Sequence, residues 1–132
     1  MRGVSHCIVH ETKGDTIMLA TILILICVAI HFYFMYLEMF KWEAPRTRKV
    51  FGQTVESAAE TKAAAANQGL YNGVVAGALL VSILLDTTLM TYYLLAGVVV
   101  LGVYAYMTVT KKALYVQSAP AALAVLASLL GL

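Results

Sequence analysis

The stretch TIMLATILILICVAIHFYFMYLEMF, residues 16–40, decides the fold class of this chain. Its uncharged part runs from Ile17 to Leu37 and has the length of about 20 residues that an α-helix needs to cross about 30 Å of hydrocarbon. Aromatic residues gather toward its carboxyl end, as they do where a helix meets a membrane interface: Phe32, Tyr33, Phe34, Tyr36 and Trp42. The pattern predicts a transmembrane helix over 17–40.

Three more apolar runs follow, and they predict helices over 63–85, 89–109 and 114–130. Pro120 falls in the first turns of the last run, where proline is tolerated better than in the middle of a helix. The chain is 61% hydrophobic and only 12% charged, whereas soluble domains are about 45–50% apolar and about 25% charged. The sequence therefore predicts an all-α, integral membrane four-helix bundle with no β-sheet.

The first seventeen residues differ from the rest of the chain. They are polar and aperiodic, they lack the features of a signal peptide, and Met18 stands directly before the first apolar run. We expect residues 1–17 to be a polar N-terminal tail or an over-called start. Residues 18–132 then form a single four-transmembrane-helix domain with a basic loop at 41–62, in which Pro45 and Gly52 interrupt helix and Thr54 opens an amphipathic helical start.

The basic residues predict the orientation of the bundle. Two of the three connections hold nearly all of them, namely Lys41, Arg46, Arg48, Lys49, Lys62, Lys111 and Lys112, while the remaining connection carries only Asp86. Basic loops stay in the cytoplasm, so we expect a multi-pass protein of the cell membrane with both termini outside. The basic segment is too short for nucleic-acid recognition, and the lipid bilayer is the expected partner.

Polar residues within the first two spans form the candidate site. His31 and Glu38 are seven residues apart, or two helical turns, and so share a face of the first helix. The second helix begins with another polar patch, and antiparallel helices place both sets at similar depth. The predicted ligand-binding residues are His31, Glu38, Asn67, Gln68, Tyr71 and Asn72.

Two interpretations of this cluster carry equal weight. Polar groups at membrane depth are costly, so they face the bundle interior and find partners. They either hydrogen-bond the two helices together or line a cytoplasm-facing cavity for a small amphiphilic molecule or lipid, with His31 and Glu38 as a proton-handling pair. A membrane enzyme using these two residues for proton transfer and a small oligomeric transporter are the alternatives. No nucleophile or metal-ligand set is present, so catalytic residues stay unassigned and no metal or cofactor is predicted.

Three glycines form a stripe on the second helix, since Gly69, Gly73 and Gly77 recur every four residues. Small residues at this spacing let a second helix approach closely in lipid. The stripe predicts a close helix contact and, with it, a homo-oligomer.

Two segments carry a resemblance to a known family. YLEMFKWEAPRTRKVFG, residues 36–52, and TKAAAANQGLYNG, residues 61–73, resemble the small bacterial and fungal membrane proteins catalogued as domain of unknown function 1304, and GVY at 102–104 and YVQSAP at 115–120 also fit. The resemblance covers about Met18 to Leu132. It implies a four-helix membrane protein of unestablished activity and supplies no catalytic residues, although the six candidate site residues coincide with its recurring motif.

Overall fold

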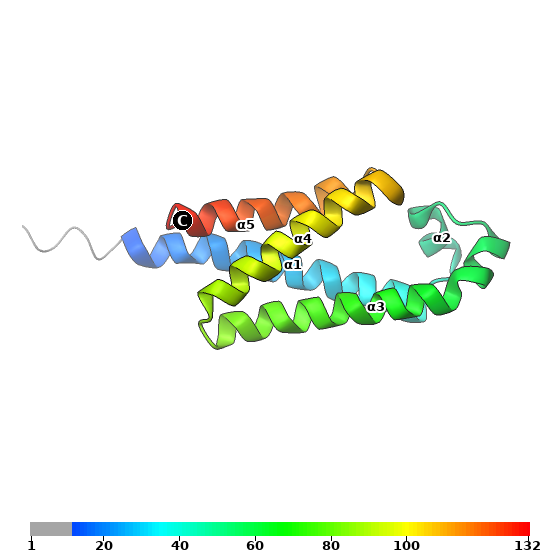
Figure 1. The fold of residues 1–132 in the computed structure, drawn as a ribbon, viewed down its shortest axis with the longest axis horizontal. Helices are drawn as coiled ribbons and strands as arrows, with labels where there is room; N and C mark the ends of the chain where they lie inside the picture. Colours follow the sequence, from blue (N-terminus) through cyan, green and yellow to red (C-terminus); the bar gives the residue numbers. More distant parts are fainter. Residues whose placement is uncertain (1–11) are drawn as a thin grey trace, which may run out of the picture.

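A computed structural model describes the backbone of residues 12–132 and the side chains of residues 18–132. Its helices are α1 (Thr12–Phe40), α2 (Pro45–Phe51), α3 (Val55–Leu84), α4 (Thr88–Thr108), η1 (Leu114–Ser118) and α5 (Ala119–Leu129). The described residues contain no strand. Four long segments, α1, α3, α4 and η1 with α5, run alongside one another, and α2 lies at the end away from Leu132 (Figure 1). The predicted all-α four-helix bundle is confirmed.

Three of the four segments are long and apolar enough to cross a membrane: Met18–Phe40, Val55–Leu84 and Thr88–Thr108. The fourth, Leu114–Leu129, is shorter. At 1.5 Å per residue it extends about 24 Å, compared with about 30 Å of hydrocarbon. The fourth helix is therefore about 6 Å shorter than the hydrocarbon is thick.

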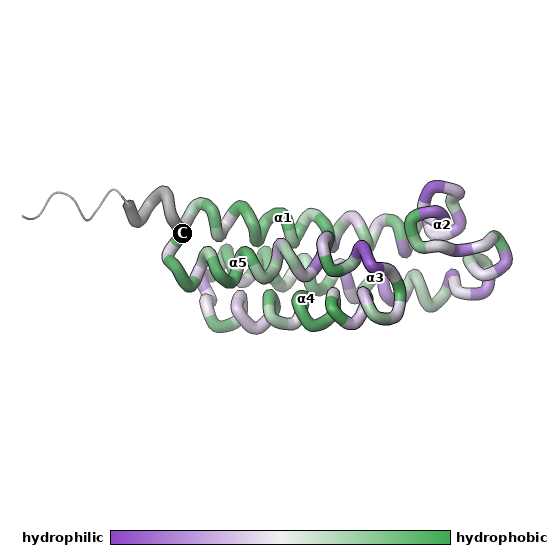
Figure 2. Tube along the Cα trace, turned by 90° about the horizontal axis from the view of Figure 1, so that it is seen from above, coloured by the Kyte–Doolittle hydropathy of each residue, from purple (hydrophilic) through white to green (hydrophobic). Residues whose placement is uncertain are grey.

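Small side chains fill much of the centre of the bundle, while large apolar ones cover its outside. Ala76, Ala121 and Ala124 have no exposed surface. In contrast, Val100 and Leu129 are each 66% exposed, and hydrophobic residues extend along the helices to the polar α2 end (Figure 2). Small residues let helix backbones approach, and a large exposed apolar surface is stable in lipid rather than in water. The arrangement indicates a membrane protein.

The segment predicted as a basic loop contains a short helix. As predicted, no helix is continuous across Pro45 and Gly52. Pro45 also starts α2, because its missing N–H falls where a helix needs no partner. Gly52 ends α2 in the left-handed conformation, at φ 66°. The expected helical start after it is confirmed, since the Thr54 side chain accepts a hydrogen bond of 3.1 Å from the Ser57 backbone N–H and α3 then runs unbroken to Leu84.

The fourth helix departs from the regular helix that the sequence predicts. Its first part, η1, is a π-helical turn in which the Ala119 N–H donates to the Leu114 carbonyl. Pro120 follows directly, and a proline cannot fit over the preceding turn of a regular α-helix, which explains the wider turn. The turn also places the Ser118 hydroxyl 3.0 Å from the Val99 carbonyl of α4.

The predicted N-terminal tail is only partly described. Residues 1–11 lie outside the described residues, and α1 begins at Thr12, before the predicted span. The suggestion that translation starts at Met18 stays a prediction.

Candidate functional site

Both predicted site residues of α1 lie on its buried face. His31 is 4% exposed and Glu38 is 8% exposed. The same face carries Ile24 and Cys27, which contribute to the apolar core of the bundle. His31 and Glu38 therefore share one face of α1, and that face is buried.

The predicted residues of α3 separate into two groups. Asn72 is buried, at 8% exposure, whereas Asn67, Gln68 and Tyr71 are exposed. The buried face of α3 repeats every three or four residues, and Gly69, Asn72 and Ala76 belong to it. The three exposed residues fall between these positions, so the structure brings only Asn72 to Glu38.

Glu38 and Asn72 form one direct link between α1 and α3. The Asn72 Nδ2 amide donates a hydrogen bond of 2.7 Å to Glu38 Oε2, and both side chains are buried. Glu38 lies inside the apolar stretch Met18–Phe40. A carboxyl group at such a position is expensive unless it is hydrogen-bonded, and Asn72 provides that bond.

Two glycines create the close helix approach that this bond needs. A Cβ atom at Gly69 would lie 2.7 Å from Met39 Cγ and 3.0 Å from Glu38 Cβ, and one at Gly73 would lie 2.5 Å from Met35 Sδ. At Gly77 nothing lies within 4 Å of such a Cβ. Gly69 and Gly73 thus face α1 of the same chain, while the predicted homo-oligomer through the whole stripe stays a prediction.

His31 is oriented by its own helix rather than by Glu38. Its Nδ1 lies 2.8 Å from the Cys27 carbonyl oxygen, which can only accept, so Nδ1 carries the proton. In the neutral ring Nε2 is then the acceptor. No hydrogen bond joins His31 to Glu38 within residues 18–132, so proton transfer between them needs a bridging molecule.

Three packed aromatic rings hold the connection between α1 and α3 in place. The Trp42 ring centre lies 5.0 Å from that of Phe51, and Phe51 in turn lies 6.3 Å from Phe34. The Trp42 indole N–H donates to the Thr61 hydroxyl at 3.1 Å. These contacts fasten α2 to both long helices at the end where Glu38 and Asn72 meet.

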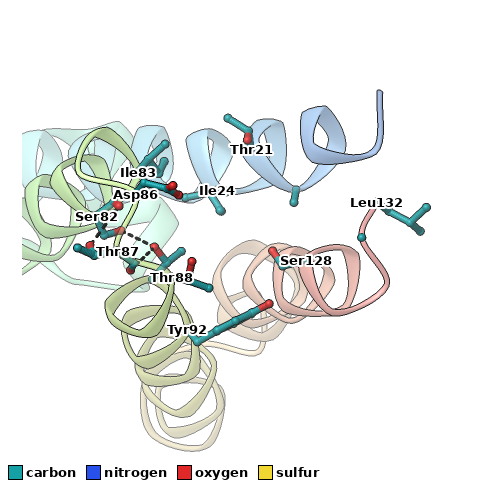
Figure 3. A pocket seen from close by; sticks show the side chains of 13 residues that line it. Thr21, Ile24, Ser82, Ile83, Asp86, Thr87, Thr88, Tyr92, Ser128 and Leu132 are labelled. Carbon is teal, nitrogen blue, oxygen red and sulfur yellow. Dashed lines mark hydrogen bonds between the residues drawn. The ribbon is translucent and has the colours of Figure 1, made fainter. Parts of the chain in front are cut away.

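A second polar region, around the connection that carries Asp86, lies at the opposite end of the bundle. A pocket of about 230 Å³ opens there between α1, the α3–α4 turn and the end of α5 (Figure 3). We call it the Asp86 pocket; its polar lining residues are Thr21, Ser82, Asp86, Thr87, Thr88, Thr91, Tyr92 and Ser128. In the sequence, the signal for this pocket is the group of hydroxyl residues around Asp86, with Ser82 before it and Thr87, Thr88 and Thr91 after it.

In the described part of the chain, no group of three His, Cys, Asp or Glu side chains is placed to hold a metal ion.

Residues 25–129 match the model of one family, which is described as a protein of unknown function, DUF1304. The chain belongs to the DUF1304 family. Neither curated proteins nor solved structures give a match to this DUF1304 chain. The residues that match the family include Glu38, Asn72 and Asp86.

Proposed function

We propose that this DUF1304 chain is a multi-pass membrane protein that binds a small amphiphilic molecule or lipid beside Glu38 and Asn72, between α1 and α3. The observation that carries the proposal is the 2.7 Å bond between these buried side chains within an apolar stretch. Ionisable groups at membrane depth are rare, and they commonly mark a site for a ligand or a proton.

The bonding capacity of the site supports a ligand. Glu38 Oε1, Asn72 Oδ1 and His31 Nε2 form no hydrogen bond within residues 18–132. Every fully inaccessible side-chain nitrogen or oxygen in this range has a partner, so these three atoms each keep some exposed surface. Together they offer acceptors to a head group that carries hydrogen-bond donors.

A purely adhesive role accounts for less of this arrangement. An interhelical hydrogen bond in a membrane contributes about 0.6 kcal/mol on average, and two neutral amides would form it without a carboxyl group. The glycines already bring α1 and α3 together through close packing. The carboxyl group of Glu38 is therefore better explained by a function beyond adhesion.

We expect Glu38→Gln to release a bound molecule without unfolding the protein. The glutamine carbonyl can still accept the bond from Asn72, but a neutral amide cannot take up a proton or pair with a cation. Native mass spectrometry of protein extracted in mild detergent should show an added mass on the unaltered chain and lose most of it in the variant.

Gln68→Ala is the matched control, because Gln68 is exposed one turn from Asn72, and it should retain the added mass. Equal loading of all three proteins, or no added mass on the unaltered chain, would contradict the proposal and leave adhesion as the role of the bond.

We also propose that the α2 end of the bundle faces the cytoplasm. The basic residues of α2 and those of the α4–η1 connection lie at one end, away from Leu132 (Figure 1). A fluorescent protein that folds only in the cytoplasm should stay dark when fused at Leu132, and an alkaline phosphatase fusion there should be active. The reverse pair of results would invert the orientation.

A further inference from the structure

The Asp86 pocket is formed by three parts of the chain that are distant in sequence. Its walls come from α1, from the α3–α4 turn and from the last residues of the chain, and Figure 3 shows Ile24, Asp86 and Ser128 on three different elements around it. The Ala20 N–H donates to the Leu132 carbonyl at 3.2 Å, which fastens the third wall to the first. The pocket volume of about 230 Å³ accommodates a small head group.

Four hydroxyl groups that line the pocket donate their protons to the protein. Ser82 donates to the Leu79 carbonyl at 2.8 Å, Ser128 to the Ala124 carbonyl at 2.8 Å, and Thr87 to the Ser82 carbonyl at 3.2 Å. Thr91 donates to Ser82 Oγ or to the Thr87 carbonyl, at 2.9 and 3.2 Å. Their oxygens keep acceptor lone pairs, so the walls favour a ligand rich in hydrogen-bond donors.

The charge of the lining points to a cation. Asp86 is the charged side chain among the lining residues, which include no Lys, Arg or His. Phosphate or carboxylate groups would therefore meet an acceptor-rich, negatively charged surface. The remaining walls include Ala20, Ile24 and Ile83, which suit a short hydrocarbon next to the charged group.

The backbone of Asp86 shows that its side chain is held at a cost. The turn is a Schellman motif, in which the Thr87 N–H donates to the Ser82 carbonyl and the Asp86 N–H donates to the Ile83 carbonyl. The middle residue of this motif is left-handed, and Asp86 has φ 51°. Glycine is the usual residue there because it has no Cβ. Aspartate adopts this conformation more readily than most residues but less readily than glycine, so its presence here favours a role for the carboxylate.

From these observations we propose that the Asp86 pocket binds a primary ammonium group carried by an amphiphile. The Asp86 carboxylate pairs with the charge, the hydroxyl oxygens accept the N–H bonds, and the apolar walls contact the first carbons of the chain. This site is separate from the Glu38–Asn72 pair and lies at the other end of the bundle.

Three probes of one chain length test the chemistry: octylammonium, octyltrimethylammonium, which has the charge but no N–H, and octanol, which lacks the charge. Isothermal titration of the whole protein in phosphatidylcholine nanodiscs, with empty nanodiscs subtracted, should show octylammonium binding at least tenfold more tightly than either other probe. Equal affinities for the three probes would overturn the proposal.

Asp86→Gly separates binding from folding, because glycine suits the turn better than aspartate. We expect this variant to melt at the same or a higher temperature and to bind octylammonium at least tenfold more weakly. Asp86→Asn should also lose binding, while Thr108→Val, outside the pocket, should retain it. A variant that lacks Asp86 but keeps full affinity would overturn the proposal.

The ammonium group has two sources, a membrane lipid or a free amine. Replacing phosphatidylcholine by phosphatidylethanolamine in the nanodiscs distinguishes them. A lipid ligand should compete and weaken the apparent affinity for octylammonium several-fold, whereas a free-amine site should be unaffected; each result supports the site and assigns its source.

Discussion

Gly69→Leu is expected to destabilise the folded chain by about 3 kcal/mol, at the upper end of what overpacking costs. The new Cβ alone would lie 2.7 Å from Met39 Cγ and 3.2 Å from the Met35 carbonyl oxygen. The side chain of Met39 can move, but the backbone of α1 cannot move without separating Glu38 from Asn72. Thermal unfolding in detergent should show a marked loss of stability.

Gly77→Leu is the matched control on the same stripe of α3. Nothing lies within 4 Å of a Cβ at this position, so its stability should change by no more than about 0.5 kcal/mol, as for surface substitutions. Equal destabilisation of both variants would contradict the packing described here. If Gly77→Leu instead converts an oligomer to a monomer in light scattering, the predicted homo-oligomer gains support at that glycine.

The second large effect is expected for Asn72→Leu, which leaves the buried Glu38 carboxyl without its 2.7 Å donor. A buried polar group that loses its partner costs about 1–3 kcal/mol. Adding Glu38→Met should restore most of the loss, because replacing both partners by apolar groups of similar shape is nearly neutral. Unfolding measurements on the two single variants and the double variant give the coupling energy.

The coupling energy from these three variants distinguishes a hydrogen-bonding role of Asn72 from a packing role. A coupling energy near zero would show that Asn72 acts through packing alone. A restored double variant that has also lost its bound molecule would show that stability and ligand binding are distinct properties of the same pair.

The number and order of the long helices could be read from the sequence, since runs of apolar residues with little charge have few other structures available. The continuous start of α3 at Thr54 was also predictable, because a capping residue and helix-forming alanines agree there. The short helix α2 was not, since Pro45 is compatible with either a break or a first helical turn.

The inward face of each helix was harder to predict. In a soluble protein the buried face is the apolar one, but here large apolar residues also cover the outside of the bundle, so residue size and close packing decide which side faces inward. Glu38 and Asn72 were predicted to be at the same depth and do meet. Gln68 and Tyr71 were grouped with them by proximity in sequence, although helical rotation places both on the exposed side.

The π-helical turn and the Asp86 pocket depend on contacts between distant segments, which local patterns do not contain. Gly102 of α4 shows this: a Cβ there would overlap the Ser118 hydroxyl and lie 3.0 Å from the Ser118 backbone nitrogen. The π-helical turn therefore packs closely against α4 only because residue 102 is a glycine. Similarly, the pocket exists only because the end of the chain returns to α1.

The length of α3 has a mechanical consequence. The helix has 30 residues and extends about 45 Å, which is about 15 Å more than the hydrocarbon is thick. Because it has no break, it acts as a rigid lever. The Trp42–Thr61 bond attaches the connection before α2 to the first turns of α3, and the Trp42–Phe51 contact joins α2 to it. A change in the tilt of α3 within a bilayer would move the attached basic segment α2, with Arg46, Arg48 and Lys49, across the lipid head groups, converting an event in the membrane into movement at its surface.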